Sequence, residues 1–505
     1  MSIYQENTQE ATEPSVKPSS IWRRAGVVRW LPYVLFFALL ANIPFWVASR
    51  WLDISQNGWF CLEYISVGLL ALFVPRLLGA VLLLLAIAVD VLAGVCETYF
   101  LSVTQCLTNL GAVRHFSGSR LLAGSAVVLL VLLTAFVEWY LAATVSAKYR
   151  LRTATCLIAF AILYLSVDCV TVVRRTGTLP HFLQPKRSFQ DLVQASYLTE
   201  VRVSRSPTVL FVHRKIFPIP TGLPIRSAAA IALGSAGHTA ASNSQQTPNL
   251  VVILVESWGL DKESSVSNAL VQPYAQPSLL RRYEIFQGTV PFYGSTVAGE
   301  ARELCGSTIG FQLMQIPASE LEGCLPKRLD ALGYHTVALH GMDGAFFDRT
   351  TWYQTIGFQE AWFRNQFQQE GLPNCPSVFP GTCDAAIAEW IGRRLEENSA
   401  KPEFVYWVTL NSHLPVPTPS PLKTPDSCSF APSLAQQPSL CSWYQLVANV
   451  HHSVADMVMT DLARPTIFVI VGDHAPPFSD SDLRNRFSST VVPYILLVPR
   501  KQQAP

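Results

Sequence analysis

The hydrophobic positions of this chain fall into two regimes. Up to about residue 175 they form long apolar stretches, and beyond it they form short runs separated by polar turns. A helix that crosses a bilayer needs about 20 predominantly apolar residues. Five stretches approach this length: Trp30–Ala48, Trp59–Val74, Leu77–Tyr99, Leu121–Thr144 and Ala154–Val173. The pattern predicts a domain of five membrane-spanning helices, the second of which is short.

These spans are expected to anchor the protein with its N-terminus in the cytoplasm. The first one begins late, lacks a small-residue cleavage site and is followed by further spans, unlike a cleaved signal peptide. Cytoplasmic loops carry an excess of Lys and Arg. Basic residues gather on one side, at Lys17, Arg23, Arg24, Arg29, Arg76, Lys148, Arg150 and Arg152, against Arg50, Arg114 and Arg120 on the other. Five crossings then place everything after about residue 174 outside.

Beyond residue 248, short apolar runs alternate with helical patterns. The runs predict buried strands at Asn249–Val255, Thr336–Leu339, Phe404–Leu410, Thr466–Val471 and Val491–Val498. The helical patterns cover Glu320–Leu332, Asp384–Asn398 and Ser442–Leu462. Strands that alternate with helices are typical of a mostly parallel sheet flanked by helices. An α/β domain is therefore predicted for this half of the chain.

These patterns divide the chain into four parts. A polar tail, predicted to be cytoplasmic, covers residues 1–27, and the five-helix transmembrane domain covers 28–175. Residues 176–247 form a juxtamembrane segment and linker. The end of this segment, 226–247, is rich in Ala, Gly, Ser, Asn and Gln and is expected to be flexible. The extracytoplasmic α/β domain covers 248–499, which is long enough for one hydrophobic core.

The composition agrees with a membrane protein and excludes a nucleic-acid-binding one. Apolar residues make up 50% of the chain and charged residues only 14%, with the apolar excess in residues 28–172. The formal net charge of +2 is small, and the sequence contains no basic patch interleaved with aromatic residues. Nucleic-acid partners require such a basic patch, so none is expected.

Six cysteines lie in the C-terminal part of the chain: Cys305, Cys324, Cys375, Cys383, Cys428 and Cys441. An even number in an oxidising compartment indicates disulfides. Six cysteines permit fifteen pairings, so the sequence leaves the connectivity open. Pairing in sequence order is the expectation because it closes three short loops. The alternative is that some of these cysteines are free buried thiols.

Four acidic residues lie within or beside the apolar stretches: Asp90, Glu97, Glu138 and Asp168. Charges inside a bilayer are costly and often functional. These residues are candidates to orient a lipid head group. The alternative is that they sit at the membrane interface or pair with one another.

Two apolar runs of the α/β domain end in groups that bind metals. Val-Val-Ile-Leu-Val runs into Glu256, and Val-Ile-Val-Gly runs into Asp473 and His474. Ligands bind at strand ends in open α/β sheets. Each signal is weak alone, because an acid after a strand is more often a solvated loop residue or a helix cap. Together the three offer oxygen and nitrogen donors that suit zinc and manganese, so they predict a divalent metal site.

Three protein ligands leave one coordination position open, and a hydroxyl group is suited to fill it. Metal coordination lowers the pKa of a bound hydroxyl and makes it a nucleophile. The candidates are Ser295 and Thr296, in a turn before the helical-looking segment Ala298–Leu304. A helix N-terminus there would offer backbone N–H groups to a phosphate. The alternative for this hydroxyl is a simple helix N-cap.

Six short motifs, in this order, resemble the alkaline-phosphatase/sulfatase superfamily. They are Val-Glu256-Ser-Trp, Ser-Thr296-Val-Ala-Gly-Glu, Leu-His340-Gly-Met-Asp343, Phe-Asp-Arg349, Asn-Ser-His413-Leu-Pro and Gly-Asp473-His474. The closer resemblance is to membrane-anchored head-group transferases: lipoteichoic acid synthase, the phosphoglycerol transferases of periplasmic glucans and the phosphoethanolamine transferases of lipid A. It is tight over residues 248–499 and only architectural over 28–175. It implies an alkaline-phosphatase-like fold.

The resemblance also implies the metal ligands and the nucleophile. The residues that match the ligands of one divalent metal, zinc or manganese, are Glu256, Thr296, Asp473 and His474. Thr296 also matches the nucleophile. It is favoured over Ser295 because the family pattern Thr-x-x-x-Glu fits Thr296 and Glu300.

Four further residues match substrate contacts of the family. His413 resembles the histidine that contacts the phosphate or the leaving group, and Arg349, Asp343 and His340 resemble head-group contacts. One position departs from the synthase pattern, because Phe347 stands where a Trp is expected. The head group therefore stays open, although the Thr-x-Ala-Gly…Cys-Gly run favours phosphoglycerol.

A competing motif is Cys324-Leu-Pro-Lys-Arg328, which resembles the formylglycine site of sulfatases. In that case Cys324 would be the nucleophile after its oxidation to an aldehyde. We favour Thr296, because Cys324 begins a helical segment and lies too far after Glu256. Sulfatases also place a second acidic ligand beside the first, whereas Ser and Trp follow Glu256.

The resemblance implies a phosphotransferase. It would move a phospho-alcohol head group, phosphoglycerol in preference, from a membrane phospholipid to an envelope glycan or glycolipid through a phospho-threonine intermediate. The alternatives are a phosphoethanolamine transferase, a sulfatase or phosphodiesterase that releases a free product, and a non-catalytic envelope scaffold. A scaffold would need a broken ligand set, and the sequence retains the set. The expected location is a bacterial inner membrane, crossed several times, with a periplasmic catalytic domain.

Overall fold

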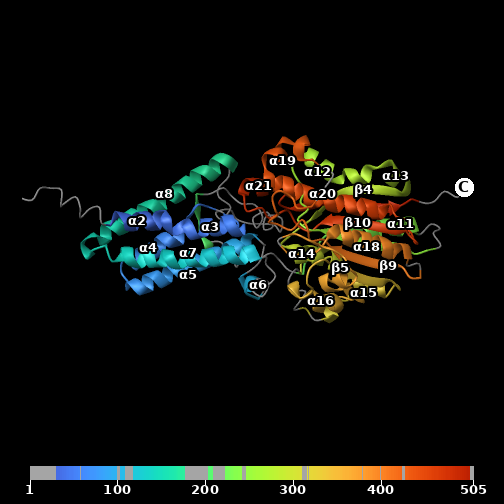
Figure 1. Cartoon of the computed structure of the whole chain (residues 1–505), viewed down its shortest axis with the longest axis horizontal. Helices are drawn as coiled ribbons and strands as arrows, with labels where there is room; N and C mark the ends of the chain where they lie inside the picture. Colours follow the sequence, from blue (N-terminus) through green and yellow to red (C-terminus); the bar gives the residue numbers. More distant parts are fainter. Residues whose placement is uncertain are drawn as a thin grey trace, which may run out of the picture.

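The two halves of the chain form a helical bundle and an α/β domain, which lie at opposite ends of the molecule in Figure 1. The computed structural model describes residues 30–56, 58–98, 103–108, 118–176, 203–208, 222–240, 246–309, 316, 318–377, 379–397, 400–422 and 427–500. The predicted tail over 1–27 and most of the predicted juxtamembrane segment lie outside these residues. The predicted fold class, apolar helices followed by a mostly parallel α/β domain, is confirmed.

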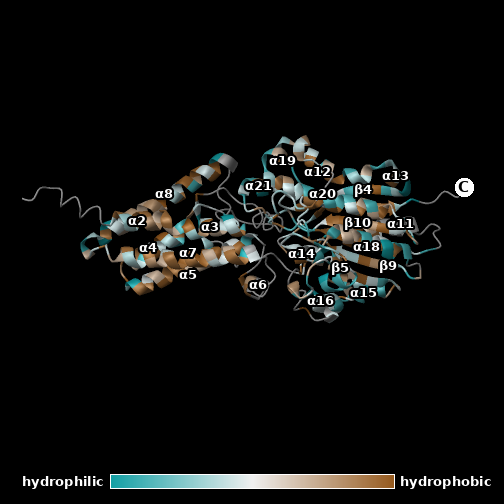
Figure 2. Cartoon of the chain, in the orientation of Figure 1, coloured by the Kyte–Doolittle hydropathy of each residue, from teal (hydrophilic) through white to brown (hydrophobic). Residues whose placement is uncertain are grey.

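Within the described residues, the bundle contains four helical segments that are long and apolar enough to cross a membrane: Leu31–Leu52, Arg76–Thr98, Arg120–Ala142 and Ala147–Arg174. They are built from α2 (Leu31–Ala38), α3 (Ile43–Leu52), α5 (Arg76–Thr98), α7 (Gly118–Ala142) and α8 (Arg150–Thr176). The second predicted span is only the short helix α4 (Leu62–Ala71). Figure 2 shows the apolar residues spread around these helices, as expected for surfaces that face lipid.

Three acids of the bundle, of which Asp90 and Asp168 are buried, bind one short segment, residues 203–208. Arg205 forms an ion pair with Asp90 at 2.7 Å, and both side chains are almost fully buried. Asp168 accepts hydrogen bonds from the backbone and side chain of Ser204. Glu63 accepts two more from the same segment. These three acids therefore anchor the chain that follows the last membrane helix.

Breaking the Asp90–Arg205 pair is expected to destabilise the bundle. Asp90→Asn leaves the Arg205 guanidinium without its counter-ion in a buried site, which costs on the order of 3 kcal/mol. The thermal unfolding midpoint of the full chain in detergent should fall. The double variant Asp90→Asn with Arg205→Gln removes both charges and should recover part of the loss. A double variant less stable than Asp90→Asn alone would contradict this account.

A seven-stranded sheet forms the centre of the α/β domain, in the order β4-β11-β10-β3-β9-β5-β6. The strands are β3 (Asn249–Val255), β4 (Tyr283–Pro291), β5 (His335–His340), β6 (Glu360–Trp362), β9 (Glu403–Val408), β10 (Thr466–Gly472) and β11 (Val491–Pro499). β11 runs antiparallel to both of its neighbours, β10 and β4, and the other neighbouring pairs of the sheet are parallel. The central strands β3, β9 and β10 are buried along their whole length, so helices cover both faces.

The helices of this domain are mostly short. They are α11 (Ala228–Ala240), α12 (Ser264–Val271), α13 (Pro277–Arg282), α14 (Thr296–Cys305), α15 (Leu325–Asp330), α16 (Arg349–Thr355), α17 (Arg364–Gln369), α18 (Asp384–Glu397), α19 (Pro432–Gln436), α20 (Pro438–Val458) and α21 (Ser481–Asn485). A small hairpin, β7 (Asn374–Cys375) with β8 (Gly381–Thr382), completes it. The predicted helix over 320–332 is shorter than expected, because α15 begins only at Leu325, next to Pro326.

The prediction of a flexible linker over 226–247 is wrong for Ala228–Ala240. This segment forms α11, which packs against β10, β11 and α14. Alanine is the best helix former, and its small side chain lets the helix lie close to the sheet. Ala228, Ala229 and Ala232 are fully buried there.

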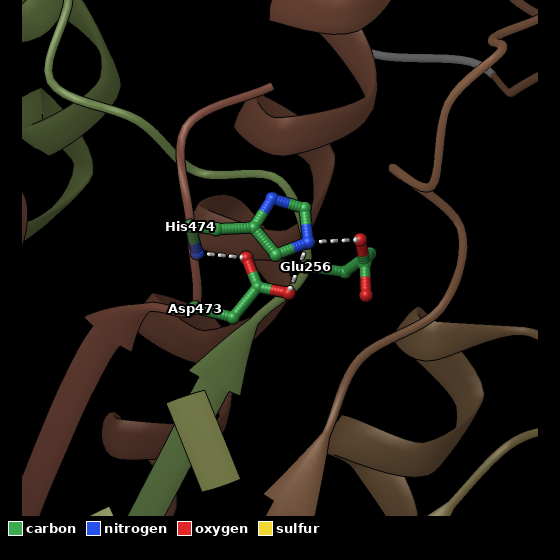
Figure 3. Close-up of side chains that lie close together, drawn as sticks. All are labelled: Glu256, Asp473 and His474. Carbon is green, nitrogen blue, oxygen red and sulfur yellow. Dashed lines mark hydrogen bonds and ion pairs between the residues drawn. The ribbon is translucent and has the colours of Figure 1, made fainter. Parts of the chain in front are cut away.

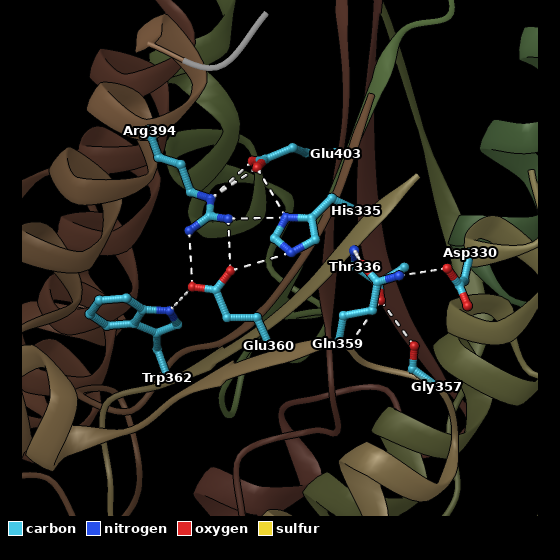
Figure 4. Close-up of polar contacts among 9 residues, drawn as sticks. All are labelled: Asp330, His335, Thr336, Gly357, Gln359, Glu360, Trp362, Arg394 and Glu403. Carbon is cyan, nitrogen blue, oxygen red and sulfur yellow. Dashed lines mark hydrogen bonds and ion pairs between the residues drawn. The ribbon is translucent and has the colours of Figure 1, made fainter. Parts of the chain in front are cut away.

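A network of charged side chains links helix α18 to one edge of the sheet. Arg394 of α18 pairs with Glu360 at 2.9 Å and with Glu403 at 3.0 Å, and His335 lies beside them (Figure 4). Because His335 and Glu403 begin their strands, this network lies at the amino edge of the sheet and ties β6 to α18.

The disulfides join Cys305–Cys324, Cys375–Cys383 and Cys428–Cys441, which confirms pairing in sequence order.

Candidate metal and nucleophile site

Four neighbouring parallel strands end at one edge of the sheet and present the predicted site residues there. β10 is followed by Asp473 and His474, β3 by Glu256, and β9 by the turn that contains His413, while β5 ends at His340. Their register is continuous, with Gly472 opposite Val255. The carboxyl edge of such a sheet is the usual place for a ligand.

Glu256, Asp473 and His474 form one compact buried cluster (Figure 3). One ligand atom from each lies within 4.8 Å of the other two. His474 Nε2 is 3.5 Å from Glu256 Oε1 and 3.2 Å from Asp473 Oδ2. Two oxygens and one nitrogen therefore point into the same small volume, which is the donor set of a divalent cation.

The backbone around this cluster fixes the direction of each carboxylate. Asp473 Oδ1 accepts the backbone N–H of Ser257 at 2.7 Å and that of His474 at 2.6 Å. Ser257 has a left-handed conformation, with φ of 56°, and its hydroxyl donates to Glu256 Oε1. Non-glycine residues in this region are strained and cluster at functional sites. Gly472 lets the end of β10 approach the backbone of Trp258, because a Cβ at this position would lie 1.9 Å from the Trp258 carbonyl oxygen.

The charges of the cluster fit a bound cation. Burial raises the pKa of Asp473 well above its usual range, and the Glu256 carboxylate raises it further. Burial lowers the pKa of His474, so its ring is neutral at pH 7. His474 Nδ1 lies 2.9 Å from the carbonyl oxygen of Ala475, which makes Nδ1 the protonated nitrogen and leaves the Nε2 lone pair facing the carboxylates. A divalent cation would relieve the repulsion between the two acids.

Thr296 brings a hydroxyl to the same place. It is the first residue of α14, and its Oγ1 donates to Glu256 Oε2 at 3.0 Å and lies 3.5 Å from His474 Nε2. Ser295 occupies the N-cap position without a capping bond, and its Oγ has no hydrogen-bond partner among the described residues. Gly299 allows the close approach of α14, because a Cβ there would lie 3.1 Å from the Asp473 backbone. Only Thr296 of the two candidates points at the cluster.

Arg349 lies buried at the start of α16 and is held by Glu300 of α14. Its Nε and Nη2 both lie 2.9 Å from Glu300 Oε1, and the Tyr353 hydroxyl donates to the same oxygen. Burial raises the pKa of Glu300, and the Arg349 charge opposes the shift. Nη1 of Arg349 is buried and has no hydrogen-bond partner among the described residues. The N–H groups of Nη1 can therefore donate hydrogen bonds to a ligand.

The remaining predicted contacts differ in their surroundings. His413 Nδ1 lies 2.6 Å from the Leu414 carbonyl oxygen, and its ring packs edge-on against Phe379. Burial, with the charge of Arg349, lowers the pKa of His340 to about 3, so His340 is neutral. Asp343 is half-buried and is engaged by other groups: it accepts the backbone N–H of Ala345 and lies 3.8 Å from Arg364 at the start of α17.

Residues outside the predicted set support the His413 turn. The buried Asp384 accepts the backbone N–H groups of Leu410 and Asn411, and its own N–H donates to the Asn411 side chain. The Thr409 hydroxyl accepts the N–H of Glu256, which couples this turn to the cluster of Glu256, Asp473 and His474. Asp384 begins a predicted helix, and an acid at that position is normally interpreted as a helix cap. The sequence therefore does not indicate that Asp384 supports the turn containing His413.

Cys324 is not available as a formylglycine. It is 2% exposed and bonded to Cys305 at the end of α14. Cys324→Ala should therefore keep activity while destabilising the protein by about 2–4 kcal/mol. Cys305→Ala is the matched control, because it breaks the same disulfide and should give the same activity and midpoint. A loss of activity in Cys324→Ala but not in Cys305→Ala would reinstate the sulfatase mechanism.

Comparison with known proteins matches the chain to one family model and to solved structures. The Sulfatase family model matches residues 248–504. No curated protein matches the chain. Among solved structures, the lipoteichoic acid synthase LtaP from Listeria monocytogenes is 15% identical, with a TM-score of 0.38, and the match covers 51% of this chain and 66% of that one, just under two thirds.

Two further solved structures are similar at the same level. The Streptococcus pyogenes phosphoglycerol transferase GacH, in complex with sn-glycerol-1-phosphate, is 15% identical over 53% of this chain and 73% of its own, with a TM-score of 0.38. The C-terminal periplasmic domain of EptC from Escherichia coli, in complex with Zn, is 13% identical over 51% and 74%, with a TM-score of 0.34.

Proposed function

The chain belongs to the sulfatase family, and on that premise we propose that it transfers a phospho-alcohol head group, phosphoglycerol in preference, from a membrane phospholipid to an envelope glycan or glycolipid. The observation that carries this proposal is the position of the Thr296 hydroxyl, 3.0 Å from Glu256 Oε2 within a cluster of buried metal-binding groups. A nucleophile of the protein itself is what a transferase needs to hold the head group between donor and acceptor.

The residues present suit one divalent metal, zinc or manganese, held by Glu256, Asp473, His474 and Thr296. When bound, the metal supplies positive charge that favours the deprotonated hydroxyl and the phosphate oxygens. The amino end of α14 adds partial positive charge at the same point. The arrangement thus favours negative charge where phosphoryl transfer develops it.

The first half of the reaction forms a phospho-threonine. Thr296 Oγ1 gives up its proton toward Glu256 Oε2 and forms a bond to the lipid phosphorus. The bond from phosphorus to the diacylglycerol oxygen breaks, and that oxygen takes a proton from His413. The contact between His413 Nδ1 and the Leu414 carbonyl leaves Nε2 as the nitrogen that exchanges the proton. Arg349 Nη1 would bind a phosphate or head-group oxygen.

The second half restores the enzyme. An acceptor hydroxyl gives its proton to His413 and bonds to the same phosphorus, while the bond to Thr296 Oγ1 breaks and Oγ1 regains its proton. Four apolar helical segments keep the site beside the bilayer that supplies the donor. We place the protein in a bacterial inner membrane, crossed several times, with the catalytic domain on the periplasmic side, where the disulfides would form.

The test is to incubate the full chain in detergent with phosphatidylglycerol or phosphatidylethanolamine and to determine the intact mass. We expect diacylglycerol release and an added phosphoglycerol on Thr296. An adduct of phosphoethanolamine mass would make the protein a phosphoethanolamine transferase. Free head-group phosphate without any adduct on Thr296, from either lipid, would overturn the proposal in favour of a hydrolase.

A further inference from the structure

Two cysteine side chains lie together where the membrane helices meet the catalytic domain. Cys96 is near the end of α5, Cys106 is on the short helix α6 (Val103–Thr108), and their Sγ atoms are 2.9 Å apart. Both side chains are buried. A disulfide bond is about 2.05 Å long, so a shift of about one ångström joins the two sulfurs. We propose that Cys96 and Cys106 form a fourth disulfide, which fixes α6 against the nucleophile helix α14.

The surroundings place this pair on the oxidising side of the membrane. Cys96 and Cys106 share one buried apolar cluster with Val297 of α14. α14 ends at Cys305, which is itself in a disulfide with Cys324. A pair that packs against this domain is exposed to the same redox conditions during folding. Figure 1 shows α6 at the boundary between the bundle and the α/β domain.

Formation of the bond requires a two-electron oxidant, for which a protein or small-molecule disulfide of that compartment is the suitable class. One cysteine thiolate attacks a sulfur of the donor disulfide and releases one donor thiol. The second thiolate then attacks the mixed disulfide and releases the other. The two protein thiols are oxidised and the donor is reduced to two thiols, which carry the two protons. Because both sulfurs are buried in the assembled protein, the exchange precedes the packing of α6 on α14.

The crosslink would restrain two parts of the active site. Val297 directly follows Thr296, and Phe347 of the same cluster lies two residues before Arg349. Phe347 has a strained backbone, with φ of 56°, and its ring lies 5.5 Å from the Arg349 guanidinium carbon. Holding α6 in place therefore restrains both the nucleophile and the arginine. This inference concerns the covalent structure and rests on no assumption about the substrate.

The pair can be tested on the unaltered full chain. The protein is denatured in excess N-ethylmaleimide, and the tryptic peptide 77–114, which contains only these two cysteines, is analysed by mass spectrometry. We expect no maleimide on it and a mass lower by two hydrogen atoms than the dithiol form. After reduction it should take up two maleimides. Alkylation of both cysteines before reduction, with the three other disulfides closed, would overturn the proposal.

Controls come from the same digest and from variants. Peptide 153–174 holds Cys156 and Cys169, which form no disulfide in the structure and should be alkylated before reduction. The double variant Cys96→Ser with Cys106→Ser should show severalfold faster amide hydrogen exchange over residues 296–305. Cys156→Ser with Cys169→Ser should not. Equal exchange in both double variants would refute the restraint on α14, whatever the state of the cysteines.

Discussion

Thr296→Ala should abolish head-group transfer, with a loss of about 10³-fold or more in diacylglycerol release from labelled phospholipid. The substitution removes the only one of the two candidate hydroxyls that points at the cluster of Glu256, Asp473 and His474. A loss of this size corresponds to about 4 kcal/mol of transition-state stabilisation. The protein should stay folded, because the side chain removed is small, and intact mass should detect no adduct after exposure to lipid.

The neighbouring hydroxyl provides the matched control. Ser295→Ala removes the same chemical group one residue earlier, and Ser295 Oγ has no hydrogen-bond partner among the described residues. Its activity should equal that of the unaltered protein. Thr296→Ser keeps a hydroxyl and should retain part of the activity. Should Ser295→Ala be the inactive variant, the nucleophile would be Ser295 and the geometry of the proposed site would be wrong.

Much of the candidate metal site could be predicted from the sequence, because an apolar run also shows where its strand ends. The run Asn249–Val255 forms β3 with the predicted bounds, so Glu256 falls at the sheet edge as expected. The run Thr466–Val471 likewise forms β10, which extends one residue further to Gly472, so Asp473 directly follows the strand. A buried parallel strand is almost wholly apolar, and the first polar residue after it marks the edge.

Elements without such a continuous apolar run escape prediction. Strand β4 (Tyr283–Pro291) lies at the edge of the sheet with most of its residues exposed or half-buried, and β6 has only three residues. The helix α11 reads as a linker because alanine and glycine give no amphipathic pattern. Local composition cannot distinguish a small-residue helix packed on a sheet from a flexible segment when the packing partner is more than 200 residues away, as β10 is.

Contacts between distant residues escape prediction for the same reason. Asp90 stands out as an acid in an apolar helix, but its partner Arg205 lies 115 residues further on, in a short polar segment. Glu300 belongs to the Thr-x-x-x-Glu pattern, yet its contact with Arg349 depends on how α14 and α16 meet. The sequence thus identifies groups that need a partner, and the fold determines which partner they receive.

Asp473→Asn should eliminate metal binding and the stabilisation that accompanies it. A ligand that binds only the folded state stabilises it by about 4 kcal/mol at a concentration about 1,000 times its Kd. For a domain of this size that raises the unfolding midpoint by roughly 10 °C. The unaltered protein should show this rise with zinc or manganese after dialysis against a chelator. Asp473→Asn should show none, because one of three clustered donors loses its charge.

The rise in the unfolding midpoint separates metal binding from general stability, because the midpoint of each variant is measured both with and without metal. Asp461→Asn is the matched control, because the ion pair of Asp461 with Arg282 is exposed and lies outside the cluster, so this variant should keep the full rise. Metal content after gel filtration should agree, falling in Asp473→Asn and in Glu256→Ala. Unchanged metal content in both variants would place the metal elsewhere and favour a non-catalytic scaffold. A metal-dependent rise in the unaltered protein that disappears only with cluster variants ties the cation to the residues that surround Thr296.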